Sequence, residues 1–90
     1  MEPTTTHMKA TNAIGQVHSL TASMSILANT IERLHPESTA HANALAEYKN
    51  TKAKAKALRD GIADADERKL ATWLIRTANK PVDANGKTIA

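Results

Sequence analysis

The sequence predicts an all-α fold, an antiparallel helical hairpin with a shorter third helix, as in a small helical bundle or a coiled coil. Apolar residues between 10 and 34 are separated by alternating steps of three and four residues, the spacing of a helix side that packs on another helix. Proline at residue 36 and glycine at residue 61 then divide the rest of the chain into two further helical stretches.

The first helix is expected over about residues 8–34, after a disordered lead over residues 1–6. Its apolar seam consists of Ala10, Ala13, Val17, Leu20, Met24, Leu27, Ile31 and Leu34. This unbroken heptad pattern predicts that one side of the helix contacts a neighbouring helix along its whole length. Gly15 is its one weak position, because glycine costs up to about 1 kcal/mol relative to alanine inside a helix.

The second helix is expected over about residues 37–60. His35 and Pro36 end the first helix, because a residue before proline avoids the helical conformation and proline suits a first helical turn. Glu37 would then complement the dipole at the helix start. Since the connection is so short, the two helices should be antiparallel. A weaker seam is formed by His41, Ala44, Tyr48, Thr51, Ala55, Leu58, Ile62 and Ala65.

The third helix is expected over about residues 65–79. Gly61 would end the second helix in a left-handed conformation, and Asp64 with Glu67 resembles a capping box. A single helix over residues 37–79 that tolerates Gly61 is the alternative. The apolar stripe is Leu70, Trp73, Leu74 and Thr77. Trp73 is expected to be the main core anchor, and an exposed binding hot spot is the alternative. Residues 1–80 then form one helical domain, and residues 81–90 a flexible tail.

Composition excludes several classes of function. The 90 residues include 17 alanines, no phenylalanine and no cysteine, so the core is sparse and helix packing or a partner must supply stability. No nucleophile motif or metal-ligand spacing occurs, and we expect no enzyme activity, no cofactor, no bound metal and no small-molecule substrate. We also expect no membrane span and no signal peptide, and a cytoplasmic location.

A basic stripe is the first candidate binding site. It consists of Lys49, Lys52, Lys54, Lys56 and Arg59, with Tyr48 beside it for stacking. At helical spacing Lys54 lies apart from the other four. Such a face could bind an acidic protein surface or follow a phosphate backbone, and it could equally be an ordinary solvated helix face.

The first helix offers a second candidate, an assembly face. No charged residue occurs between Ala10 and Ile31, so this helix could be buried on both sides at modest cost. The face comprises Ile14, Val17, Leu20, Met24, Ile26, Leu27 and Ile31, of which Ile14 and Ile26 lie off the seam. A helix with a polar, solvent-exposed back is the alternative.

Together these features predict a small non-enzymatic protein-interaction module, an adaptor, assembly factor or inhibitor. Its partner would be a larger protein complex with an acidic surface, or another copy of the chain. Small helical chains without cysteine are common among accessory proteins of phages and mobile elements, and such a source is one expectation. The alternative function is non-sequence-specific binding of nucleic acid through the basic stripe.

Overall fold

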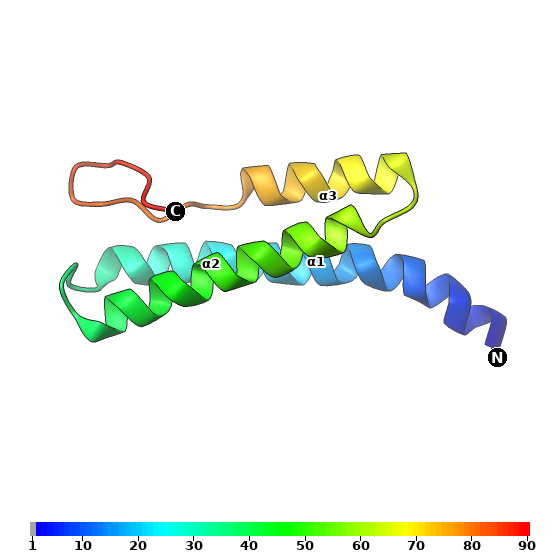
Figure 1. Ribbon diagram of the computed structural model, residues 1–90, viewed down its shortest axis with the longest axis horizontal. Helices are drawn as coiled ribbons and strands as arrows, with labels where there is room; N and C mark the ends of the chain where they lie inside the picture. Colours follow the sequence, from blue (N-terminus) through cyan, green and yellow to red (C-terminus); the bar gives the residue numbers. More distant parts are fainter. Residues whose placement is uncertain (1) are drawn as a thin grey trace.

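The computed structural model describes the backbone of residues 2–90 and the side chains from Ala13 onward. The chain forms three helices, α1 (Glu2–Arg33), α2 (Thr39–Asp60) and α3 (Ala65–Thr77). Helices α1 and α2 form an antiparallel hairpin, and α3 runs alongside and contacts both of them (Figure 1). The predicted fold class, a helical hairpin with a shorter third helix, is confirmed.

Helix α1 begins earlier than predicted. It starts at Glu2 instead of about residue 8, so the expected disordered lead is wrong for residues 2–6, and Met1 lies outside the described residues. Pro3 is compatible with this start. Proline lacks an amide hydrogen, but amide hydrogens in the first turn of a helix have no backbone acceptor in any case.

The buried side of α1 follows the predicted seam only in part. Its buried residues are Val17, Thr21, Met24, Ala28 and Ile31. The seam residues Leu20 and Leu27 are only half-buried. This side is shifted because the hairpin partner is not the only neighbour: Ala28 belongs to the same core cluster as Ala78, which directly follows α3. The buried side of α1, rather than the whole seam, therefore faces the centre of the three-helix arrangement.

The turn between α1 and α2 is capped by Ser38. Its side-chain oxygen accepts a hydrogen bond from the backbone N–H of His41 (3.1 Å), and its hydroxyl donates to the carbonyl of His35 (2.8 Å). Helix α2 thus begins at Thr39, two residues later than predicted. Glu37 precedes the cap, so its expected place in the first helical turn is wrong.

Helix α2 ends at Asp60, which confirms a break at Gly61 and excludes the single long helix. The predicted left-handed conformation of Gly61 is wrong, because its φ is −85° and its ψ is −4°. Its N–H instead continues the helical pattern by donating to the carbonyls of Ala57 and Leu58. The chain leaves the helix by this tightened last turn, which requires no positive φ.

Helix α3 begins as predicted and buries a different side. The Asp64 carboxylate caps it by accepting from the N–H of Glu67 (2.9 Å). The buried residues are Ala71, Ile75 and, just past the helix end, Ala78, and Leu74 of the predicted stripe packs against the same core. Trp73 lies about 200° around the helix from Ala71. It is 52% exposed, so the prediction that Trp73 is the main core anchor is wrong.

The segment after α3 packs on the hairpin. Pro81 is fully buried, and Ile89 and Ala90 contact the core cluster around Met24. Between them Val82 and Thr88 form an isolated antiparallel bridge that closes a turn through Gly86. The flexibility of residues 81–90, and the boundary at residue 80, stay predictions.

Candidate functional site

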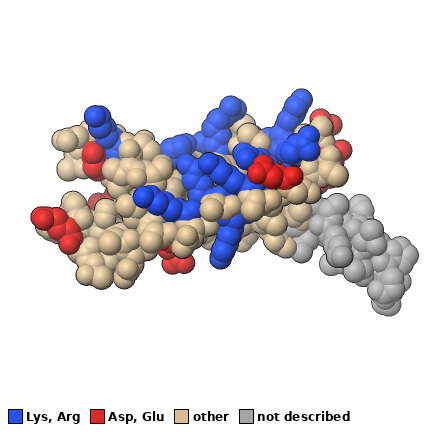
Figure 2. All heavy atoms as spheres, in the orientation of Figure 1, with Lys and Arg blue, Asp and Glu red and all other residues tan. Residues whose placement is uncertain are grey.

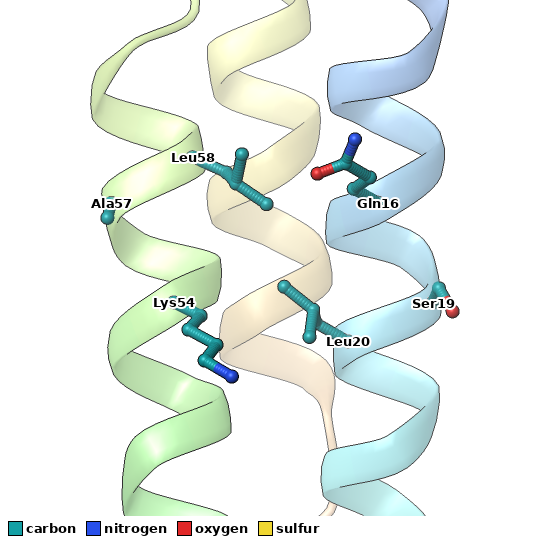
Figure 3. A pocket seen from close by; sticks show the side chains of 6 residues that line it. All are labelled: Gln16, Ser19, Leu20, Lys54, Ala57 and Leu58. Carbon is teal, nitrogen blue, oxygen red and sulfur yellow. The ribbon is translucent and has the colours of Figure 1, made fainter.

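An open groove runs between α1 and α2 on the side away from α3. Its first part is lined by Gln16, Ser19, Leu20, Lys54, Ala57 and Leu58 and has a volume of about 560 Å³. Leu20 and Leu58 point toward each other across it, with α3 behind the two helices (Figure 3). Lys54 reaches from α2 over the same gap. The third helix therefore covers one face of the hairpin and leaves this one open.

The groove continues toward the hairpin turn. A second depression is lined by Leu20, Ser23, Ile26, Leu27, Glu47 and Thr51. Because Leu20 lines both parts, they form one surface, which we call the open groove. The side chain of Ile26, at 66% exposed, is the most accessible large apolar residue among those described. The charged residues lining the open groove are Glu47 and Lys54.

The structure divides the predicted assembly face between the core and the open groove. Val17, Met24 and Ile31 are at most 1% exposed and belong to the core of the single chain. They are therefore unavailable to a partner unless the chain unfolds. Ile14 packs against the core cluster around Val17. The residues at the open groove are Leu20, Ile26 and Leu27.

Sequence reasoning missed the contribution of α2 to this surface. Glu47 and Leu58 come from α2, and the heptad pattern assigned Leu58 to the seam. The signal was present, since Glu47 and Lys54 are seven residues apart and so lie on one side of a helix. What could not be deduced was which face α3 would leave uncovered.

The basic stripe forms a second candidate surface, assembled from two parts of the chain. Burial lowers the pKa of Lys52, and the positive charges of Lys56 and Lys80 lower it further. Lys80 follows α3, and its ammonium donates to the carbonyl of Arg76 (3.0 Å). Figure 2 shows lysine and arginine side chains gathered over α2 and α3 on one face of the molecule. We call Lys49, Lys52, Lys56, Arg76 and Lys80 the basic face.

Tyr48 and Arg59 form contacts within the chain, and Lys54 lies on a different surface from the other lysines of the predicted stripe. Tyr48 is fully buried and its hydroxyl donates to the carbonyl of Asn79 (3.0 Å), so its predicted availability for stacking is wrong. Arg59 pairs with the carboxylate of Asp60 at 3.0 Å. Lys54 lines the open groove, as its helical position apart from the other cations indicates.

The described residues form neither a metal-binding cluster nor a membrane-spanning helix. From Ala13 onward, no group of three or more histidine, aspartate or glutamate side chains is placed to hold a metal ion. Over the described helices, none has both the length and the apolar character needed to cross a membrane. The absence of enzyme activity stays a prediction.

Comparison with known proteins does not indicate a function for this chain. The sequence matches no protein-family model, and no curated protein or solved structure is significantly similar to it. The assignment of function therefore rests on the open groove and the basic face.

Proposed function

We propose that this chain is a helical protein-interaction module, an adaptor, assembly factor or inhibitor that docks through its open groove. The supporting observation is the exposure of large apolar side chains on that face in a chain with few of them. Ile26 is 66% exposed, and Leu20 and Leu27 beside it are only half-buried. Apolar surface gathered in this way is typical of binding sites.

The polar residues of the open groove also favour docking of a protein partner. Gln16, Ser19 and Ser23 carry no charge, and removing hydroxyl and amide groups from water costs far less than removing ions. Full burial of one isoleucine side chain contributes about 1.5–3 kcal/mol. A partner covering Ile26 and its neighbours therefore gains apolar contact at small desolvation cost. Such a protein acts sterically, by bridging or blocking what it binds.

The test is capture of partners from an extract of source cells, with tagged wild-type protein and two matched variants. Ile26→Asp places a charge in the open groove, and Asn29→Asp adds the same charge at an exposed position of α1 outside its lining residues. We expect Ile26→Asp to lose a stoichiometric protein partner that Asn29→Asp retains. Equal capture by all three proteins would contradict the proposal.

Nucleic-acid binding through the basic face is a second candidate function. The crowding of Lys52 by Lys56 and Lys80 favours it, because a polyanion would relieve the repulsion among these cations. Contacts to three or four phosphates of a duplex would give a log–log salt dependence of affinity with a slope of about −2.7 to −3.6. The double variant Lys52→Glu/Lys56→Glu should abolish this binding.

Nuclease treatment separates the two candidates. Partners that survive nuclease and depend on Ile26 support docking through the open groove. Retained nucleic acid, with binding that depends on Lys52 and Lys56 and falls steeply with salt, supports the second function. Affinity for duplex or single strands that is equal at low and moderate salt would contradict it.

A further inference from the structure

We infer that the open groove takes a second copy of this chain, with the two hairpins packed face to face and antiparallel about a two-fold axis. This inference rests on the proposed protein-interaction function and names the partner. In this arrangement α1 lies against α1 of the second copy, α2 lies against α2, and α3 stays on the outside of each. Leu20, Leu27, Glu47 and Lys54 lie in the open groove at positions that point to this arrangement.

The midpoint between the two leucines on α1 and the midpoint between the two charged residues on α2 lie at the same level along the hairpin. Leu20 and Leu27 lie symmetrically about Ser23–Met24 on α1, and Glu47 and Lys54 lie symmetrically about Asn50–Thr51 on α2. Ser23 and Thr51 line the same depression of the open groove, so the two midpoints lie side by side. A two-fold axis through this level, perpendicular to the helices, therefore relates both pairs at once.

The contacts across that axis are complementary. In an isologous interface the contact of one residue with another occurs twice. Leu20 of each copy would meet Leu27 of the other, and Glu47 of each would meet Lys54 of the other. Among the described residues neither Glu47 nor Lys54 forms an ion pair within its own chain. Their separation of seven residues, about 10 Å along the helix, keeps them apart.

The same charges disfavour other arrangements. If the two-fold axis ran parallel to the helices, α1 of each copy would lie against α2 of the other. Glu47 and Lys54 would then be covered by a helix that carries no charged residue between Ala10 and Ile31, which is destabilising. The hairpin face between residues 13 and 34 is about 30 Å long and about 20 Å wide, which gives about 600 Å² for each partner. Since stable complexes bury about 800 Å² per partner, we expect a dimer with a dissociation constant in the micromolar range.

Charge reversal tests this inference with the full-length chain. Sedimentation equilibrium over a wide concentration range should give a monomer–dimer equilibrium for the wild type. Glu47→Lys and Lys54→Glu should each weaken dimerisation about tenfold, since two attractive pairs become two repulsive ones. The double variant Glu47→Lys/Lys54→Glu should restore the wild-type affinity. Lys69→Glu, a matched change at an exposed position of α3 outside the open groove and the basic face, should have little effect.

A mixture of the single variants is the sharpest measurement. One variant then presents two lysines and the other two glutamates, so they should form a heterodimer although each self-associates weakly. Circular dichroism checks that every variant stays helical. A wild type that is monomeric at millimolar concentration, or a dimer unaffected by either reversal, would overturn the inference.

The outcome also separates this inference from the proposed function. A monomeric wild type whose capture of a different protein depends on Ile26 would overturn the two-fold dimer and leave the interaction module intact. A monomer that captures nothing through the open groove would overturn both.

Discussion

Replacing Tyr48 by phenylalanine tests how the chain after α3 is held against the hairpin. The tyrosine ring is fully buried and its hydroxyl donates to the carbonyl of Asn79 (3.0 Å). The N–H of Asn79 donates in turn to the side-chain oxygen of Ser25 on α1 (3.1 Å). One residue is therefore attached to both helices of the hairpin, across 31 residues in one case and 54 in the other.

The expected cost of Tyr48→Phe follows from these contacts. The ring keeps its packing, so the change removes one hydrogen bond and leaves the Asn79 carbonyl without that donor. A net loss of about 1 kcal/mol in the free energy of unfolding is expected. In a domain of this size that corresponds to a decrease of about 4–8 °C in Tm.

Ser25→Ala extends the measurement to the second attachment. Chemical denaturation of the wild type, both single variants and the double variant gives the coupling between the two hydrogen bonds. Because both bonds hold Asn79, we expect the effects to be non-additive by about 0.5 kcal/mol or more. Additive effects would mean that the two bonds act independently.

The pH dependence supplies an independent check. Burial raises the pKa of the Tyr48 phenol, so the native chain keeps this proton to higher pH than the unfolded chain. The stability from this group is complete below the unfolded pKa of about 10 and is lost as pH rises through the native pKa. The stability advantage of the wild type over Tyr48→Phe should therefore shrink above about pH 10. Ionisation of Lys52 occurs in both proteins and cancels in the difference.

Two results would refute this reasoning. If Tyr48→Phe leaves the unfolding free energy unchanged at neutral pH, the hydroxyl does not hold Asn79. If the difference between the two proteins is the same at pH 8 and pH 11, the phenol is not buried as described.

Further substitutions test other parts of the structure by the same denaturation measurement. Gly61→Ala should raise stability by about 0.4–1 kcal/mol, since φ is negative and no atom lies closer than 3.6 Å to an added Cβ. Gly86→Ala should lower it by about 1–2 kcal/mol, because φ is +81° there; equal effects at the two glycines would contradict the backbone assignment. Asp64→Ala should cost about 1 kcal/mol through loss of the α3 cap, and Asp64→Asn should recover most of it. Met24→Ala should cost about 2–5 kcal/mol by leaving a cavity, whereas exposed Ile26→Ala should change stability by less than about 0.5 kcal/mol.

The sequence alone determined the features that depend on residues close together in the chain, namely the helices and one of their caps. The spacing of apolar residues in α1 predicted a helix with one buried side, and Val17, Met24 and Ile31 are buried as expected. Asp64 was identified as a cap because capping requires only a carboxylate three residues before a free N–H. Ser38 was missed as a cap, since Pro36 gave an equally acceptable local start for α2.

Tertiary structure decided which side of each helix faces a neighbour. The pattern in α3 placed Trp73 in the core because it is the largest apolar residue, yet the helix packs through Ala71, Ile75 and Ala78. Small residues allow closer approach of the helix axes, and that preference is expressed only when another helix is present. Helical spacing alone separates Lys54 from Lys52, but the position of α3 decided that Lys54 lies at the open groove and Lys52 beside Lys80.

Local periodicity and the breaks at Pro36 and Gly61 therefore determined that this chain forms three helices, and they identified only part of the buried side of α1. The face of the hairpin that α3 covers, and so the composition of the open groove and the basic face, came only from packing among segments far apart in the chain. The physical reason is that a helix's hydrogen bonds and caps lie within a few residues. The choice between two apolar faces depends instead on contacts that exist only after folding.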